Sequence, residues 1–120
     1  MNLKYPLLWD QKLPLLRLSG KGVTSFLHGQ TTADFLTAEK SFLVHCCWLN
    51  AIGRVKAILE VCLTDDGADI VVLGGCVDEI FRAFQMTIFP ADQVELDPIR
   101  EIRRVQILNS HECDRFKNVS

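Results

Sequence analysis

The sequence predicts an α+β fold, in which an antiparallel sheet carries two main helices on one face in the ferredoxin-like order β-α-β-β-β-α-β. Three observations lead to this class. Apolar residues alternate with other residues in several short runs, which is the period of a strand. They recur at helical spacing in two further segments, each preceded by glycines. The turn signal Asp65-Asp66-Gly67 joins two apolar runs directly, which favours antiparallel neighbours.

The beginning of the chain is predicted to be extended, because Pro6 and Pro14 disfavour a helix there. The first strand is expected over Leu13–Leu18, where the alternation begins. No linker, internal repeat or low-complexity segment divides the rest of the sequence. We therefore predict an N-terminal arm (1–12), a single module (13–108) and a polar tail (109–120).

The first helix is predicted to follow the turn Ser19–Gly22, and Gly29 is expected to end it. Its apolar stripe has the spacing i, i+3, i+4 and consists of Val23, Phe26 and Leu27. A second short helical turn is expected to begin at Thr31–Asp34, with Phe35 and Leu36 buried.

A three-stranded meander is predicted next. Ser41–Leu49 is apolar on both faces, which places it centrally in the sheet. The loop Asn50–Gly53 then leads to a strand over Arg54–Leu63. The hairpin turn at Asp65-Asp66-Gly67 connects this strand to the third one, Ala68–Leu73.

The second helix is predicted from its amphipathic pattern. Gly74-Gly75 precedes it and Pro90 ends it. Its apolar positions are Val77, Ile80, Phe81, Phe84 and Ile88. Short strands at Gln93–Leu96 and Arg104–Leu108 complete the predicted order.

Length and charge exclude several classes. A chain of 120 residues suits one domain, and a net charge of −2 gives no global field for nucleic acid. The basic cluster Arg100–Arg104 contains Glu101 and no aromatic residues, which favours a solvated face. No apolar run is long enough to span a membrane, and the N-terminus lacks the pattern of a signal peptide. We therefore expect a cytoplasmic protein with neither membrane nor direct nucleic acid partners.

The five cysteines are expected to be free thiols. Their number is odd, and four lie in or beside apolar segments, so burial in a reducing compartment is the simplest interpretation. Neighbouring residues of a strand point to opposite faces, so Cys46 and Cys47 cannot clamp one metal ion together. We therefore predict no metal site.

Two short motifs are candidates for ligand binding. Gly20-Lys21-Gly22 lacks the earlier glycine and the following hydroxyl residue of a phosphate-binding loop, which favours a tight turn. Lys21 retains a charge suited to an anionic ligand. In the loop Asn50–Arg54, Gly53 permits a positive φ angle and Arg54 suits carboxylate recognition. Taken alone, this loop is either a plain hairpin connection or a binding loop.

The order and spacing of these motifs resemble a known family over about residues 13–108. The resemblance is carried by Gly20, Phe26-Leu27, Gln30, Thr32, Asp34, Leu49-Asn50 and Gly53-Arg54. In this respect the chain is similar to the N-terminal part of the YgfZ-type folate-binding proteins. These are relatives of the aminomethyltransferase (T-protein) of the glycine cleavage system.

The resemblance implies a domain of the folate-binding cloverleaf, with tetrahydrofolate or a derivative as the cofactor. YgfZ-type proteins support iron–sulfur cluster assembly or repair and affect tRNA-modifying enzymes. T-proteins transfer a one-carbon unit to tetrahydrofolate. The residues expected to contact folate are Asn50, Gly53, Arg54, Gln30 and Lys21.

The sequence also departs from these families. T-proteins carry an Asp-Asp pair where this chain has Ala57-Ile58, so a proton-accepting group is missing. The later YgfZ signature, Lys-Gly-Cys-x-x-Gly-Gln, does not occur, so we expect a truncated module. The predicted function is therefore non-catalytic folate binding or an accessory role. The alternative is an interaction module that kept the fold without folate, in which a homodimer or a complementary domain covers an exposed apolar face.

Overall fold

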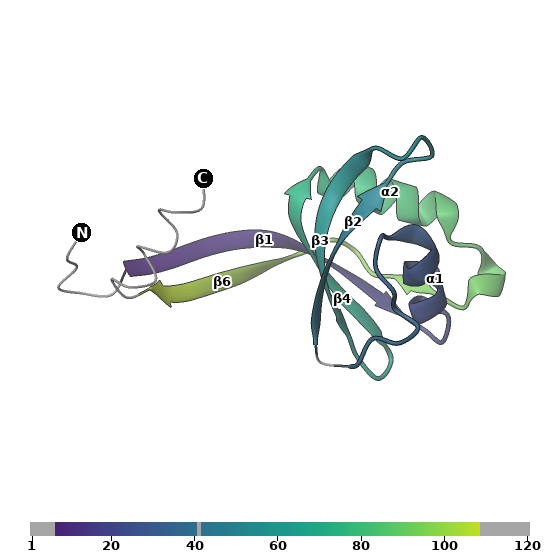
Figure 1. The fold of residues 1–120 in the computed structure, drawn as a ribbon, viewed down its shortest axis with the longest axis horizontal. Helices are drawn as coiled ribbons and strands as arrows, with labels where there is room; N and C mark the ends of the chain where they lie inside the picture. The colour runs from purple at the N-terminus through teal and green to yellow at the C-terminus, as the bar shows by residue number, and fades with distance from the viewer. Residues whose placement is uncertain (1–6, 41, 109–120) are drawn as a thin grey trace. The chain divides into compact units, whose positions relative to one another are not determined.

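The computed structural model describes residues 7–40 and 42–108 and is an α+β structure with two helices and an antiparallel sheet of six strands (Figure 1). The α+β class is confirmed, whereas the ferredoxin-like order is not. The elements in chain order are β1 (Leu7–Ser19), α1 (Val23–Gln30), β2 (Leu43–Leu49), β3 (Val55–Leu63), β4 (Gly67–Gly75), α2 (Val77–Thr87), the 3-10 turn η1 (Pro90–Asp92), β5 (Glu95–Leu96) and β6 (Arg100–Leu108).

The chain divides into two compact units. The larger is Pro14–Glu101, and the smaller contains the described residues of Met1–Leu13 and Ile102–Ser120. In the smaller unit, Arg103 donates from Nε to Asp10 Oδ1 at 2.9 Å and from Nη2 to Asp10 Oδ2 at 2.6 Å. This two-point contact joins the strand segments that come from the two ends of the chain.

The strand order in the sheet is β2-β3-β4-β1-β5, and β6 also pairs with β1. The predicted central position of the Ser41–Leu49 strand is wrong, because β2 lies at one end of this order. Its apolar residues on both faces misled the prediction. The hairpin between β3 and β4 is confirmed, and the Thr64 N–H donates to Gly67 O at 2.8 Å across its turn.

The register places one apolar face of the sheet under the helices. Cys46 pairs with Leu59, Val61 with Ile70, and Leu16 again with Ile70. Both helices of the larger unit lie against the sheet (Figure 1), and their apolar stripes belong to the buried core. The largest side chains that are fully buried include Leu16, Leu18, Leu27, Phe35, Leu59, Ile70, Ile80 and Phe84.

An aromatic cluster forms the centre of the contact between the helices. The rings of Phe26 and Phe84 lie edge to face with their centroids 5.5 Å apart, so α1 and α2 pack against each other. The Phe84 ring also meets the Trp48 ring of β2 edge to face at 6.3 Å. This cluster joins the helices to the end strand of the sheet.

Several predicted boundaries are wrong for identifiable reasons. β1 begins at Leu7 instead of Leu13, so residues 7–12 of the predicted arm belong to a strand, and β6 begins at Arg100 instead of Arg104. Residues 1–6 and the predicted tail lie outside the described residues. Gly29 does not end α1, since a helix tolerates a glycine near its end and continues to Gln30.

The helical turn predicted at Thr31–Asp34 does not form. Instead, the Thr32 N–H donates to Cys47 O at 3.0 Å, and Thr32 Oγ1 accepts from the Cys47 N–H at 2.9 Å. The segment therefore satisfies backbone groups at the outer edge of β2, where a helical turn would leave them unpaired. Phe35 is buried as predicted, but Leu36 is 61% exposed.

Candidate functional site

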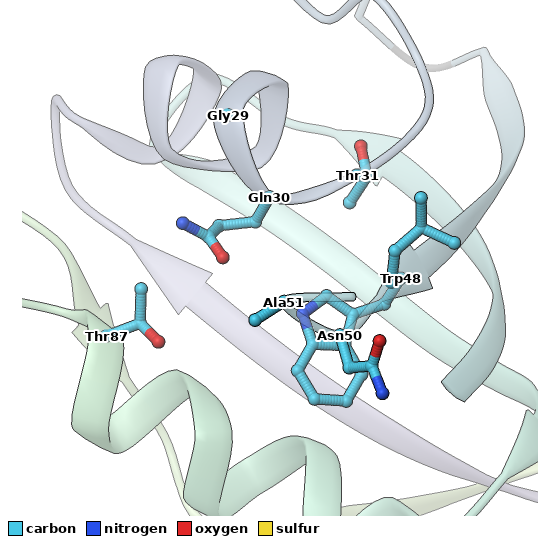
Figure 2. A pocket seen from close by; sticks show the side chains of 8 residues that line it. Gly29, Gln30, Thr31, Trp48, Asn50, Ala51 and Thr87 are labelled. Atoms are coloured by element: carbon cyan, nitrogen blue, oxygen red, sulfur yellow. The ribbon is translucent and has the colours of Figure 1, made fainter. Parts of the chain in front are cut away.

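A pocket of about 540 Å³ lies at the C-terminal ends of α1, β2 and α2 (Figure 2). This volume falls within the usual range of small-molecule sites. We call it the first pocket, and its lining residues are Gly29, Gln30, Thr31, Trp48, Leu49, Asn50, Ala51 and Thr87. The structure thus brings together two of the predicted site residues, Gln30 and Asn50, from segments that are far apart in the sequence.

The first pocket is lined by both polar and apolar side chains, and none of its lining residues is charged. Figure 2 shows the Gln30 amide, the Trp48 indole and the Thr87 hydroxyl around the same space. Thr31 Oγ1 donates to Leu27 O at 2.8 Å, and Thr87 Oγ1 donates to Ala83 O at 2.6 Å. Both hydroxyl protons are engaged, and Thr31 Oγ1 also accepts from the Ala33 N–H at 3.4 Å, so the Thr87 oxygen is the better acceptor for a ligand. The pocket therefore suits a neutral ring with hydrogen-bonding edges.

Gln30 is the most versatile group in this pocket. In the described part of the chain its side-chain amide has no hydrogen-bond partner, so one acceptor and two donor hydrogens remain for a ligand. Its position follows from local structure. The Thr31 N–H donates to Leu27 O at 3.0 Å and ends α1 directly after Gln30. The last side chain of the helix is thereby placed beside the indole of Trp48 (Figure 2).

Asn50 closes its own loop, a role that the sequence interpretation missed. Its Oδ1 accepts from the Ile52 N–H at 3.1 Å and from the Arg54 N–H at 3.0 Å. The Asn50 N–H donates to Arg54 O at 2.9 Å. An asparagine three residues before a glycine is a typical signal of such side-chain-to-backbone turns. Only the Nδ2 group of Asn50 is left for a ligand.

Gly53 and Arg54 lie in the same loop but do not line the first pocket. Gly53 has a φ of 83°, as predicted, and a side chain added there would meet nothing within 4 Å. The positive φ, and not close contact, is therefore the reason for glycine at this position. Arg54 is exposed. Ligand contacts through these two residues stay a prediction.

A second pocket of about 640 Å³ adjoins the first, because Gly29, Gln30 and Thr87 line both. Its other lining residues are Lys21, Gly22, Ser25, Phe26, Phe89, Ala91, Asp92 and Gln93. The structure therefore also brings Lys21 into one site with Gln30. Sequence reasoning missed Trp48, Thr87 and Phe89, and only the proximity of Trp48 to Asn50 could have indicated one of them.

Gly20 and Gly22, on either side of Lys21, allow the backbone of Asp92 and Gln93 to come close. A Cβ atom on Gly20 would lie 2.1 Å from Gln93 O, and one on Gly22 would lie 1.6 Å from Asp92 O. The Gly20 N–H donates to Asp66 O at 2.8 Å, and the Gly22 N–H donates to Gln93 O at 3.2 Å. These donors are used within the protein. The geometry supports the interpretation as a tight turn over that of a phosphate loop.

The Ala57-Ile58 pair faces neither pocket. Ala57 is 2% exposed and points into the apolar core opposite Trp48, whereas Ile58 is 49% exposed on the other face of β3. An aspartate at position 57 would be buried among apolar side chains, where an ionised carboxylate is costly. The structure thus offers a packing reason for a small apolar residue at this position.

The carboxylates with perturbed pKa values also lie outside both pockets. Asp34 accepts the Leu36 N–H at 2.9 Å and the Thr37 hydroxyl at 3.1 Å, and these bonds lower its pKa. The Thr64 hydroxyl and the Arg17 guanidinium both donate to Asp66 and lower its pKa. Both carboxylates hold loops in place, so neither is poised as a general acid.

The four thiols in the described part of the chain form no cluster for metal binding. Within residues 7–40 and 42–108 no cluster of three or more His, Cys, Asp or Glu side chains could hold a metal ion. Cys46 is buried, and burial raises the pKa of its thiol. Cys47 and Cys62 are half-buried and Cys76 is exposed, so the prediction of burial is wrong for Cys76. Cys113 lies outside the described residues.

Comparison with known proteins does not identify a family. No protein-family model matches the chain, and no curated protein matches it. In the described part of the chain, no helix is both long and apolar enough to cross a membrane.

Proposed function

We propose that this domain binds a reduced folate without catalysing a reaction on it, and that it serves as an accessory module for iron–sulfur cluster assembly or repair and tRNA modification. One observation carries the folate proposal. Gln30 and Asn50, which the family resemblance marks from separate segments, line one pocket together with the indole of Trp48. A pterin is planar and has several hydrogen-bonding edges, so an aromatic ring and two amides are suitable partners for it.

The non-catalytic part of the proposal rests on the chemistry of the pocket walls. The first pocket offers amides, hydroxyls and an indole, none of which serves as a general acid or base near neutral pH. The position that carries a carboxylate in T-proteins is occupied by Ala57, which is buried in the core. Binding energy is therefore available in this pocket, but no general acid or base is.

Fluorescence of Trp48 provides the test. Replacing Trp9 by Phe leaves Trp48 as the only tryptophan, so its emission reports the first pocket. Titration with formyltetrahydrofolate should give a saturable change. Gln30→Ala should weaken binding about three- to tenfold, because one or two hydrogen bonds are lost. The absence of a saturable change in the parent protein at high micromolar ligand would contradict folate binding.

Two variants control for indirect effects. Gln85→Ala removes an exposed glutamine of α2 that lines neither pocket, and it should leave the affinity unchanged. Asn50→Asp keeps acceptor oxygens for the two loop N–H groups but removes the Nδ2 donor. It should therefore retain the fold and bind the ligand more weakly. Equal losses in Gln30→Ala and Gln85→Ala would indicate a non-specific effect.

A second candidate function is protein association through the sheet face opposite the helices. Leu43, Ile58 and Leu73 lie on that face and are 58%, 49% and 39% exposed. A homodimer or a complementary domain that covers them would bury apolar surface. Sedimentation at several concentrations should then show self-association that Ile58→Asp abolishes and Met86→Asp, on exposed α2, does not. A monomer at every concentration would count against the homodimer.

A further inference from the structure

The two adjoining pockets differ in charge. The first has no charged lining residue, whereas the second contains Lys21 and Asp92. Asp92 Oδ2 accepts the Phe89 N–H at 2.8 Å, so this carboxylate has a structural task in the η1 turn. Lys21 is exposed and has no ion-pair partner in the described part of the chain. A cation without a partner, at the edge of a pocket, is available to an anionic ligand.

The second pocket, which Lys21 and Gln30 both line, has apolar side chains that suit an aromatic spacer. Phe89 is 63% exposed although it is a large apolar residue, and it lines the second pocket together with the buried Phe26. Gln30 borders both pockets, so a ligand that fills the first pocket can continue past this side chain into the second. The two adjoining pockets together therefore offer an uncharged site, apolar side chains and a cation.

We propose that the second pocket holds the benzoylglutamate tail of the folate whose pterin ring occupies the first, and that Lys21 is a specificity-determining residue that binds a tail carboxylate. This inference rests on the proposed folate function and adds a ligand preference to it. The domain distinguishes complete folates from free pterins of the same ring chemistry by their negative charge.

Calorimetry with a matched pair of ligands tests the inference. Formyltetrahydrofolate carries the tail, and methyltetrahydropterin has the same type of ring without it. Lys21→Gln should lower the affinity for formyltetrahydrofolate about two- to fivefold, which is the range for an exposed ion pair. Lys21→Arg should retain this affinity, and neither variant should change the affinity for methyltetrahydropterin. The loss in Lys21→Gln should shrink at high salt, because salt screens an exposed pair.

Lys56→Gln is the matched control, because Lys56 is an exposed lysine that lines neither pocket. It should bind both ligands as the parent protein does. If Lys21→Gln leaves the affinity for formyltetrahydrofolate unchanged, or lowers the affinity for both ligands equally, the proposed role of Lys21 is wrong. Folate binding itself would still stand. If the parent protein binds neither ligand, the proposed function fails and this inference with it.

Discussion

Replacing Phe84 by alanine tests whether the aromatic cluster holds the site together. Phe84 is fully buried, and its ring meets Phe26 at 5.5 Å and Trp48 at 6.3 Å. Truncating a buried phenylalanine costs about 3–5 kcal/mol. Each edge-to-face pair contributes about 0.5–1.5 kcal/mol beyond its buried area, which places this site near the upper end of that range. The total free energy of unfolding of a domain of this size is about 5–15 kcal/mol.

The expected loss in the free energy of unfolding is therefore about 5 kcal/mol, which lowers Tm by at least about 20 °C for a domain of about 100 residues. Chemical denaturation followed by far-UV circular dichroism measures this loss in the free energy of unfolding. Met86→Ala is the control on the same helix, because Met86 is 82% exposed and its truncation should change stability by less than about 0.5 kcal/mol. If Phe84→Ala cost no more than Met86→Ala, the packing of α2 on the core would be refuted.

Three further predictions concern hydrogen bonds and glycines of the larger unit. Arg17→Ala should cost about 1–2 kcal/mol in urea denaturation, because Arg17 is the only donor tying β1 to the carboxylates of the β3–β4 hairpin among the described contacts. Thermal stability should fall with acidification below about pH 4, since the pKa values of Asp34 and Asp66 are lower in the fold than in the unfolded chain. Their stabilisation is complete above the unfolded pKa and is lost as pH drops through the folded one. Gly22→Ala should destabilise by more than about 2 kcal/mol because of its clash with a carbonyl, whereas Gly29→Ala should stabilise by up to about 1 kcal/mol.

Each of these predictions has a matched comparison. Arg82→Ala removes an exposed arginine of α2 and should leave urea denaturation unchanged. The double variant Asp34→Asn/Asp66→Asn should flatten the acid side of the pH profile, and an unaltered slope would assign acid lability to other groups. The two glycine variants control each other, so equal effects would mean that the close approach of Gly22 to the η1 turn is not tight.

Most elements could be predicted because their signals are local. The hairpin at Asp65–Gly67 and the amphipathic helix around Phe84 depend on residues that are neighbours in the chain. The position of β2 could not be predicted in the same way. Its two apolar faces resemble those of a central strand, and nothing in the strand itself shows that its outer edge pairs with Thr31 and Thr32. That pairing depends on where α1 ends.

The candidate site could be predicted only in part, for a related reason. Gln30 and Asn50 were recognisable from motif spacing, but their meeting at one pocket depends on the pairing of Thr31 and Thr32 with the outer edge of β2. Lys21 was recognisable only as a charge. Its place in the second pocket follows from the contact of the Gly20–Gly22 turn with the carbonyls of Asp92 and Gln93, which line the same pocket. Such backbone contacts between distant segments leave no periodic pattern in a sequence.

The three residues Gln30, Thr31 and Thr32 connect the fold to the site. Thr31 ends α1 through its bonds to Leu27 O, and Thr32 pairs with both backbone groups of Cys47. Directly before these fixed points, the Gln30 side chain leaves the helix beside the residue that follows Cys47, which is Trp48. The hydrogen bonds that end α1 and cover the edge of β2 thus also position the Gln30 amide for a ligand. A binding role for Gln30 therefore needs no structural feature beyond those that the fold already requires.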